Sequence, residues 1–386
     1  MASPAQDLDF MRLALRLAKK GRGRTSPNPM VGAVVTRGGR VIGSGWHQQA
    51  GDPHAEIVAL RDVQSQGSTA RGAVLYVTLE PCRTFGRTPP CTDAIIAAGI
   101  KKVVVAATDP NPLHAGRGFE VLRRAGIEVT TGLLEKEATE LNEVFNHWIV
   151  QRRPYITLKA AMTLDGRIAT ATGQSRWITG AAARAESMRL RGLHDAILVG
   201  VETILADDPF LTWRPSAGSA SPARRNPLRR IVLDSKARTP ASAKIVTDDF
   251  ASSTTIFVTR AAPRRRIDLL RRKVGVVVAP TNNARVDIPW VLARLGKEET
   301  TSLLVEGGGE VHGSFIESGQ VQRIVFFYAP MVLGGKKAKR AIGGAGIPSL
   351  ALAPKLVQVR WKHLGSDLML RARVRPPLSA AVQNLA

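Results

Sequence analysis

The side chains best suited to chemistry in this 386-residue chain gather around its only two cysteines, Cys82 and Cys91, in the segment TLEPCRTFGRTPPC at positions 78–91. Upstream, the tripeptide HAE supplies His54 and Glu56. One imidazole and two thiolates form a nitrogen and sulfur ligand set that suits zinc, and three protein ligands leave a fourth position open for water. Zinc lowers the pKa of bound water to about 7, so hydroxide becomes available at neutral pH.

Glu56 is the candidate proton shuttle, because it follows the imidazole by two residues and would not itself ligate the metal. A carboxylate there can take a proton from water and hand it to a leaving amine, as general acid–base catalysis requires. The order H-x-E, then P-C, then a second C is typical of zinc nucleobase deaminases. The plainer alternative is a buried histidine beside two incidental thiols, which the ordered appearance of these motifs disfavours.

These residues need a scaffold that brings distant segments together, and the first 150 residues alternate helix with strand. The patterns predict a hairpin at 30–46, helices at 8–21, 53–63, 91–100 and 135–151, and strands at 73–79 and 101–107. We expect Pro53 at the first position of its helix. His54 and Cys91 should then each lie at a helix start, where partial positive charge favours thiolate and hydroxide. The alternation indicates a largely parallel sheet covered on both faces.

A second unit is predicted to begin at RRP (152–154), because proline biases the preceding residue away from helix. Strands and helices again alternate beyond it. We expect exposed connections at 214–229 and 260–273. The basic clusters at 223–230 and 263–273 are interpreted as solvated loop and helix faces.

Composition limits the classes of function. The net charge of +24 attracts anions, which could be nucleic acid or a phosphorylated metabolite. Aromatic residues make up only 5%, which argues against a base-stacking platform for nucleic acid. Two cysteines exclude a disulfide framework and suit a reducing compartment, so we expect a cytoplasmic protein. No stretch approaches the roughly 18 apolar residues of a membrane span.

The segment LLVEGGGEVHGSF (303–315) predicts a strand, a glycine turn and a helix. The glycines at 307–309 would let the backbone approach a pyrophosphate, and the helix start would present free N–H groups to it. A tight strand-to-helix turn without a ligand explains the same glycines equally well.

Several segments of the first half, including TSPNPMVGAVV, GWHQQAGDPHAE, YVTLEPC and DPNPLHAGRG, resemble the pyrimidine deaminase of riboflavin biosynthesis. LKAAMTLDGRIA, LRGLHDAILVGVETILADDPFLTWR and VEGGGEVHGSF resemble its reductase. The chain is thus similar, over nearly its whole length, to the bifunctional diaminohydroxyphosphoribosylaminopyrimidine deaminase and 5-amino-6-(5-phosphoribosylamino)uracil reductase. The resemblance implies an α/β chain, with a cytidine-deaminase-like domain at 1–150 and a dihydrofolate-reductase-like domain at 154–376.

The resemblance also implies site residues in both halves. The family's metal ligands match His54, Cys82 and Cys91, its proton shuttle matches Glu56, and its first substrate contacts match Asn28, His47 and Arg87. Its NADPH contacts match Ala161, Trp177, Thr203, Asp207, Ser235, Gly308, Gly309, Glu310, Val311, His312, Gly313 and Ser314. Its second set of substrate contacts matches Ser175, Arg191, Leu211, Arg214 and Glu306. Without the resemblance, Trp177 would be interpreted as a core aromatic and Asp207 as a turn residue.

One departure from the family pattern lies beside the metal ligands. After the first cysteine the family usually has Ser-His-aromatic, and the histidine helps to hold the pyrimidine, whereas this chain has Arg83-Thr84-Phe85. Thr84 can still form hydrogen bonds but cannot carry a charge. We expect deaminase activity with altered substrate binding.

The leading hypothesis is a bifunctional enzyme with zinc and NADPH as cofactors. It would deaminate a phosphorylated diaminopyrimidine and then reduce the ribosyl group to ribityl. We expect a homo-oligomer with no nucleic-acid or membrane partner. The alternatives are a deaminase of RNA or DNA with a nucleic-acid-binding second half, and a zinc-stabilised binding protein whose catalytic sites have decayed.

Overall fold

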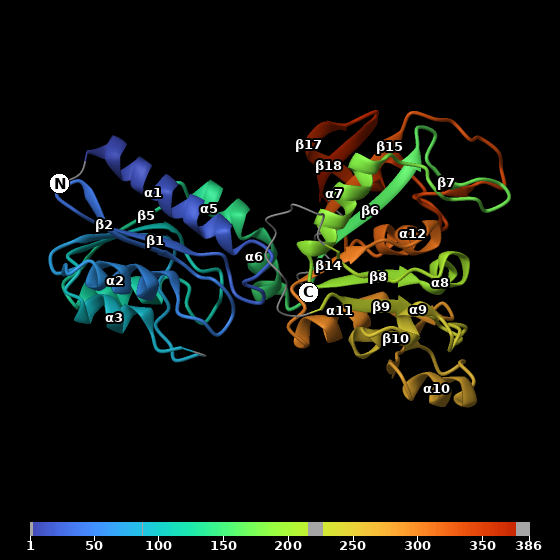
Figure 1. The fold of residues 1–386 in the computed structure, drawn as a ribbon, viewed down its shortest axis with the longest axis horizontal. Helices are drawn as coiled ribbons and strands as arrows, with labels where there is room; N and C mark the ends of the chain where they lie inside the picture. The colour runs from blue at the N-terminus through green and yellow to red at the C-terminus, as the bar shows by residue number, and fades with distance from the viewer. Residues whose placement is uncertain (1–2, 87, 215–226, 376–386) are drawn as a thin grey trace. The chain divides into compact units, whose positions relative to one another are not determined.

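The computed structural model describes residues 3–86, 88–214 and 227–375, and the chain divides into two compact units, Met1–Arg152 and Arg153–Ala386 (Figure 1). Each unit has its own sheet and its own hydrophobic interior. Within the described ranges, no helix combines the length and the hydrophobicity needed to cross a membrane.

The described part of the N-terminal unit is built on a five-stranded sheet in the order β2-β1-β3-β4-β5. Its strands are β1 (Gly32–Arg37), β2 (Arg40–Trp46), β3 (Val74–Leu79), β4 (Lys102–Ala107) and β5 (Glu128–Thr131). Its helices are α1 (Pro4–Ala18), α2 (Ala55–Ser65), α3 (Cys91–Ala97), α4 (Arg117–Arg124), α5 (Glu135–Leu141) and α6 (Glu143–Gln151). β3, β4 and β5 are parallel, but β1 pairs antiparallel with both β2 and β3. The expected largely parallel sheet is therefore wrong for this unit, because the hairpin strand β1 enters in the opposite direction.

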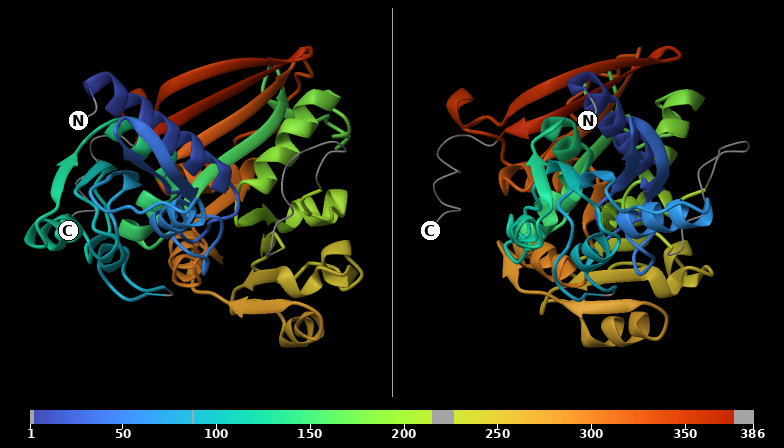
Figure 2. Two further views of the ribbon diagram at one scale, coloured as in Figure 1. Left: turned by 60° about the vertical axis from the view of Figure 1, so that its left-hand side comes forward. Right: turned by 90° about the vertical axis from the view of Figure 1, so that its left-hand side faces the viewer.

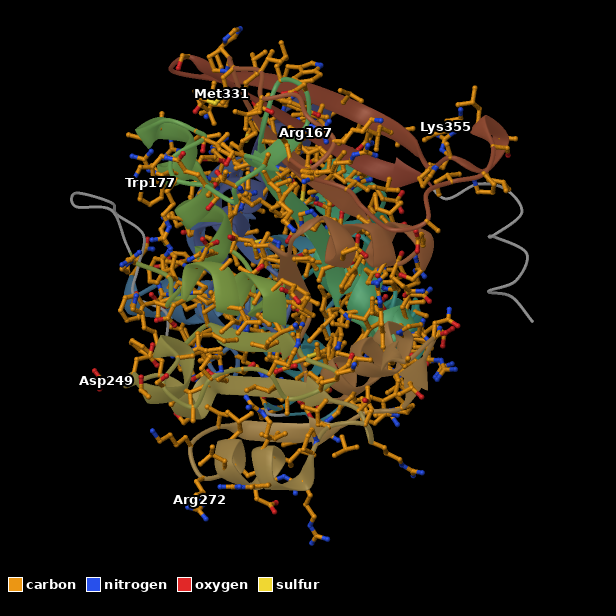
Figure 3. The ribbon with its side chains drawn as sticks, turned by 90° about the vertical axis from the view of Figure 1, so that its right-hand side faces the viewer. Arg167, Trp177, Asp249, Arg272, Met331 and Lys355 are labelled. Atoms are coloured by element: carbon orange, nitrogen blue, oxygen red, sulfur yellow. The ribbon has the colours of Figure 1, made fainter. Side chains whose placement is uncertain are left out.

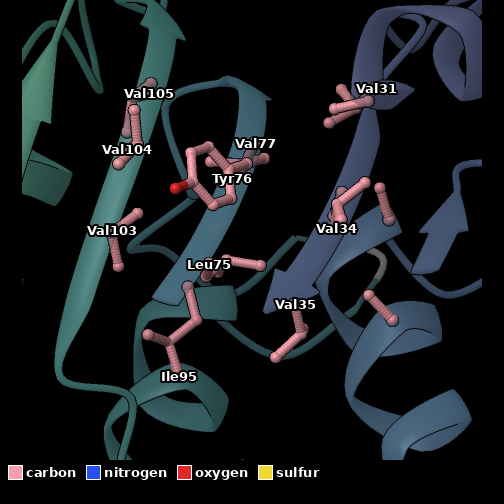
Figure 4. Packing of buried hydrophobic residues seen from close by; sticks show 14 of the residues in the cluster. Val31, Val34, Val35, Leu75, Tyr76, Val77, Ile95, Val103, Val104 and Val105 are labelled. Atoms are coloured by element: carbon pink, nitrogen blue, oxygen red, sulfur yellow. The ribbon is translucent and has the colours of Figure 1, made fainter. Parts of the chain in front are cut away.

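The interior of this unit forms between the sheet and its helices. Figure 4 shows Val34 of β1, Leu75 and Val77 of β3 and Val104 of β4, all almost inaccessible to solvent. α2 lies directly on the hairpin because Gly45 has no side chain: a Cβ there would lie 2.6 Å from the Ala59 nitrogen. This close approach fixes the axis of α2 and therefore the direction of its first residues.

Two differences between the predicted and the observed helices of the N-terminal unit have a local physical cause. The single helix expected at 135–151 is interrupted at Asn142, whose amide side chain accepts from the Met30 nitrogen at 2.8 Å and donates to the Met30 carbonyl at 2.9 Å. This tertiary contact fixes the break between α5 and α6. Pro53 does not occupy the first helical position, because His54 is the extended N-cap residue and α2 begins at Ala55.

The described part of the second unit contains a nine-stranded sheet in the order β11-β10-β9-β8-β14-β6-β15-β18-β17. These strands are β6 (Tyr155–Thr163), β8 (Ala196–Gly200), β9 (Arg229–Leu233), β10 (Thr254–Val258), β11 (Gly275–Val278), β14 (Ser302–Val305), β15 (Arg323–Ala329), β17 (Lys355–Leu364) and β18 (Asp367–Arg375). Four short strands form two further ladders: β7 (Arg167–Ala169) with β16 (Lys339–Arg340), and β12 (Thr281–Asn282) with β13 (Arg285–Val286). The helices are α7 (Ala181–Gly192), α8 (Val201–Asp207), α9 (Lys244–Thr247), α10 (Arg264–Arg271), α11 (Ile288–Lys297) and α12 (Gly309–Glu317).

The nine-stranded sheet is parallel from β11 to β15. The antiparallel hairpin of β17 and β18 continues it beyond β15. This hairpin and β11 lie at opposite ends of the sheet (Figure 2). β17 is the edge strand there, and its side chains are largely exposed along its length.

The basic segments of the second unit differ in their burial. α10 occupies much of the segment expected to be a connection at 260–273, and its arginines line a solvated face as expected; Arg272, just beyond it, also points outward (Figure 3). Residues 215–226 lie outside the described residues. Arg230 contradicts the solvated interpretation of 223–230, because it is completely buried in β9 and pairs with Asp248 at 2.6 Å.

Candidate active sites

The three predicted metal ligands converge at the ends of three elements. His54 precedes α2, Cys91 opens α3, and Cys82 follows β3. The His54 Nδ1 atom lies 3.2 Å from the Cys91 sulfur and 3.5 Å from the Cys82 sulfur. All three ligand atoms lie within 4.8 Å of one another.

This donor set fits zinc. Bond lengths of about 2.0 Å to nitrogen and about 2.3 Å to sulfur separate two tetrahedral ligands by roughly 3.5 to 3.8 Å. The measured separations of 3.2 and 3.5 Å are close to those values. Within the described residues, the cluster consists of these three side chains, which leaves one tetrahedral position for a small molecule.

The electrostatics of the cluster favour a metal-binding thiolate. The Cys91 thiol and the His54 imidazole both stabilise the negative sulfur of Cys82 and hold its pKa at about 4, although burial opposes them. Cys82 raises the pKa of His54 in return. Because metals bind deprotonated ligands, such a cluster exchanges protons for a cation.

Glu56 lies in the first turn of α2 and is only 3% exposed. Burial raises the pKa of its carboxyl to about 7, against the opposing influence of His54. A group with that pKa can both accept and donate a proton near neutral pH, which is the property that a proton shuttle needs.

The structure places two of the predicted substrate contacts beside the cluster. The Asn28 amide nitrogen lies 3.0 Å from the His47 Nε2 atom, and the His47 Nδ1 atom lies 3.2 Å from the Pro53 carbonyl. The rings of His47 and His54 meet edge to face, with centroids 5.3 Å apart. Burial lowers the pKa of His47, so a neutral ring, with Nδ1–H donating to Pro53, is favoured.

The loop between the cysteines contributes a residue that the sequence motifs did not identify. The Thr88 hydroxyl lies 3.3 Å from the His54 Nε2 atom. If Nε2 carries the proton and donates it to this hydroxyl, Nδ1 keeps a free lone pair toward the cysteines, as metal-ligating histidines require. Phe85 is 77% exposed, and the predicted substrate contact Arg87 lies outside the described residues.

In the second unit, several predicted residues lie at the carboxyl ends of neighbouring parallel strands. Ala161 is near the end of β6, Thr203 follows β8, Ser235 follows β9 and Glu306 follows β14. The sheet order places these four strands side by side, as β9-β8-β14-β6. Ligands of open parallel sheets bind at this edge.

A charged cluster surrounds Glu306. Arg191 donates two hydrogen bonds to its carboxylate at 3.0 and 2.9 Å, and the Lys159 ammonium lies 3.6 Å away. Burial alone would raise the pKa of Glu306, but the two cations outweigh it and hold the pKa at about 2. Arg191 also donates to the Thr212 carbonyl at 3.1 Å.

The other predicted contacts of the second unit differ from one another in exposure and in hydrogen bonding. The Ser175 hydroxyl donates to Asp207 at 3.3 Å, at the end of α8. Trp177 is 69% exposed, lies on the outside of its unit (Figure 3) and is covered by the Arg184 guanidinium at 4.7 Å, so it is not a core aromatic. Leu211 is buried, whereas Arg214 is exposed.

The three glycines before α12 differ in the space around them. A Cβ at Gly307 would lie 2.6 Å from Val311, and a Cβ at Gly309 would lie 2.4 Å from the Arg340 carbonyl. A Cβ at Gly308 would meet no described atom within 4 Å. Gly308 therefore leaves open space at the helix start, where N–H groups can receive a phosphate, whereas its two neighbours are glycines because the protein itself crowds them.

Among the predicted NADPH contacts from Gly308 to Ser314, the structure buries His312 and Gly313. The His312 Nδ1–H donates to the Ala341 carbonyl at 2.7 Å. A Cβ at Gly313 would lie 2.3 Å from the Gly343 carbonyl. Glu310, Val311 and Ser314 keep partial or full exposure on the first turns of α12.

We predict that His312 makes the second unit acid-sensitive. Burial lowers its pKa to about 4, below the value of about 6.5 in an unfolded chain. Between those pH values the unfolded state binds more protons, so the free energy of unfolding falls as the pH falls from 6.5 to 4, by about 3 kcal/mol in full. His312→Asn should flatten this slope. Pulse proteolysis in urea measures the free energy of unfolding of each unit separately, because each unit gives its own proteolytic fragments. His363→Asn at an exposed position is the control, and equal slopes for wild type and His312→Asn would contradict the prediction.

Comparison with known proteins supports both halves of the chain. Residues 4–107 match the family "Cytidine and deoxycytidylate deaminase zinc-binding region", and residues 154–370 match the "RibD C-terminal domain". The riboflavin biosynthesis protein RibD of Aquifex aeolicus is 46% identical over 364 residues, covering 94% of this chain and 97% of the relative. That of Actinobacillus pleuropneumoniae is 44% identical over 373 residues, covering 96% of each chain.

Solved structures agree in fold over almost the same length. RibD of Acinetobacter baumannii superposes with a TM-score of 0.83 at 36% identity, covering 96% of this chain and 99% of that one. A diaminohydroxyphosphoribosylaminopyrimidine deaminase/5-amino-6-(5-phosphoribosylamino)uracil reductase of Thermotoga maritima gives 0.79 at 34% identity, with the same coverage.

The fold and the two sites define a bifunctional enzyme in which a deaminase domain precedes a reductase domain. The family within this class follows from sequence identities above 40% to RibD proteins over nearly the whole chain. The chain belongs to the RibD family of riboflavin biosynthesis proteins.

Proposed function

We propose that the first unit hydrolytically deaminates 2,5-diamino-6-ribosylamino-4(3H)-pyrimidinone 5′-phosphate and that the second unit reduces the product with NADPH to 5-amino-6-ribitylaminouracil 5′-phosphate. The observation that carries the proposal is the convergence of His54, Cys82 and Cys91 with buried Glu56 beside them. Membership of the RibD family supports both activities in one chain.

In the deaminase unit, the chain's residues bind the pyrimidine and move protons. Zinc held by the His54, Cys82 and Cys91 side chains would supply the positive charge that makes water acidic at neutral pH. Glu56 takes the proton released when water adds to the amino-bearing carbon and returns it to the departing amine, so ammonia leaves neutral. Asn28 and His47, joined at 3.0 Å, orient the ring beside it.

In the reductase unit, the carboxyl edge of β9, β8, β14 and β6 would hold NADPH, with its phosphates at the open turn of Gly308. NADPH supplies the hydride, and the protein supplies position and charge. The substrate would contact Arg191 and Glu306, and the Lys159 ammonium beside them belongs to the same charged cluster. The positive charge of the cluster suits a phosphorylated substrate.

We further propose a homo-oligomer in the cytoplasm that needs no nucleic-acid or membrane partner. The exposed edge strand β17 offers a surface for a second copy. Two thiols in one cluster need a reducing compartment to stay available as ligands.

The decisive test supplies the diaminopyrimidine substrate to the full chain with and without NADPH. We expect ammonia release without NADPH, and NADPH oxidation only after the deaminated intermediate has formed. Treatment with a strong chelator should abolish ammonia release and leave reduction of added intermediate unchanged, with restoration by zinc. Metal-free protein that still releases ammonia would refute the first half of the proposal. Failure to oxidise NADPH with the intermediate would refute the second.

A further inference from the structure

Glu80 is a buried carboxylate that the mechanism above does not use. It follows β3 and is 4% exposed. Its two oxygens accept three backbone N–H groups from residues 109–118, which comprise a loop and the first two residues of α4 and are here called the 109–118 loop. The three donors are Asp109 at 3.1 Å, Gly116 at 2.8 Å and Gly118 at 2.8 Å. Charge-assisted bonds to backbone N–H groups are among the stronger hydrogen bonds in proteins, so one carboxylate fixes both ends of this loop.

The same loop is attached on both sides of the metal ligand Cys82. Before the ligand, a Cβ at Gly118 would lie 2.4 Å from the Pro81 carbonyl, so the loop backbone touches the segment that leads into Cys82. After the ligand, the Arg83 guanidinium donates to the Leu113 carbonyl at 3.4 Å. The 109–118 loop therefore packs against the residues on both sides of Cys82.

Two side chains where this loop meets the Cys82 segment carry polar atoms without a hydrogen-bond partner in the described residues. The Arg83 Nε atom and the His114 Nδ1 atom are buried and have no hydrogen-bond partner in the described part of the chain. Buried polar atoms in folded proteins are nearly always paired, so each unpaired one calls for a ligand or a water.

We propose that Glu80 is a positioning residue of the deaminase site, which holds the 109–118 loop beside Cys82 so that His114 and Arg83 contact the pyrimidine substrate. The inference rests on the proposed deaminase function and names residues that would recognise its substrate. His114 and Arg83 offer hydrogen-bonding groups to the polar edge or the phosphate of the substrate.

Substrate binding and chemistry depend on different contacts in this site. The ligands His54 and Cys91 are held by the starts of α2 and α3, and Cys82 is tied to α3 because its carbonyl accepts from the Thr92 nitrogen at 3.2 Å. None of these contacts passes through Glu80. Releasing the 109–118 loop should therefore weaken binding while the metal and the proton shuttle stay in place.

The first experiment compares Glu80→Gln with wild type in the full, zinc-loaded chain. The glutamine NH2 group is a donor and cannot accept the backbone N–H groups that Glu80 accepts. The 109–118 loop should then lose its position, and we expect the deaminase KM to rise roughly tenfold. The expected kcat stays within about threefold, and zinc content and NADPH oxidation are unchanged. Asp62→Asn is the matched control, because the Asp62 carboxylate also accepts a backbone N–H, from Ser44 at 2.7 Å. Asp62 lies near the end of α2, whereas the ligand His54 precedes its start. Its KM should equal that of wild type.

A double-mutant cycle tests whether Glu80 acts through His114. We expect His114→Ala to raise KM, and the double variant to raise it no further than the larger single effect, because the released loop no longer presents the imidazole. If the increases in KM of the two single variants multiply in the double variant, the proposal is wrong. Loss of zinc or of kcat in Glu80→Gln at unchanged KM would overturn it as well. Wild-type protein that releases no ammonia would instead refute the proposed function itself.

Discussion

Replacing Glu56 by glutamine should reduce the rate of ammonia release by roughly 10²- to 10⁴-fold while the second unit keeps its full rate of NADPH oxidation. The amide has nearly the same shape as the carboxyl but cannot take up a proton from water. Glu56 is nearly inaccessible to solvent, so bulk buffer cannot readily replace it. Single-turnover ammonia release, measured on zinc-loaded protein, gives the effect directly.

The interpretation of this result depends on two further measurements. Zinc stoichiometry should be unchanged, because Glu56 lies outside the cluster of three ligand side chains. Glu137→Gln, the same change at an exposed position of α5, should leave both activities intact. A Glu56→Gln protein that retains metal and still deaminates within threefold of wild type would exclude Glu56 as the proton shuttle.

The buried ion pair of Arg230 and Asp248 should dominate the stability of the second unit. Arg230 is completely buried and donates to both Asp248 oxygens at 2.6 and 2.7 Å. It also donates to the Phe210 and Ile245 carbonyls and to the Thr254 hydroxyl. Removing one partner leaves an uncompensated charge in the interior, so Asp248→Ala should lower the free energy of unfolding by about 3 to 5 kcal/mol.

The control is an exposed ion pair of the same unit. Arg238 pairs with Glu202, which is 73% exposed, and Glu202→Ala should change stability by no more than roughly 0.5 kcal/mol. The combined replacement Arg230→Met with Asp248→Leu should be much less destabilising than Asp248→Ala alone, because it removes both charges. Pulse proteolysis in urea compares the free energies of unfolding of the variants. A decrease below about 1 kcal/mol for Asp248→Ala would show that other groups stabilise the buried guanidinium.

Local sequence patterns were sufficient for the metal cluster. His54 and Cys91 lie at helix starts, as predicted, and Cys82 follows the predicted apolar strand β3. These positions depend on short-range rules for helix starts and strands, and such rules can be applied without knowing the tertiary fold.

Residues whose role depends on distant contacts could not be predicted in this way. Asn142 breaks a helix because of Met30, more than a hundred positions away. Arg230 looks like part of a solvated basic run until Asp248 is placed beside it. Glu80 lies within a recognised motif, but its three backbone donors come from a loop whose position the motif does not specify.

The strand order has a consequence for how the chain is completed during synthesis. All strands of the first sheet come from the first 131 residues, so this unit can close its interior while the ribosome is still adding the second half. The second sheet differs, because β6, its earliest strand, pairs with β15, and β15 pairs with β18, which ends at Arg375. The reductase half therefore cannot finish its sheet until Arg375 has been translated, by which time the first unit has long had all of its own strands.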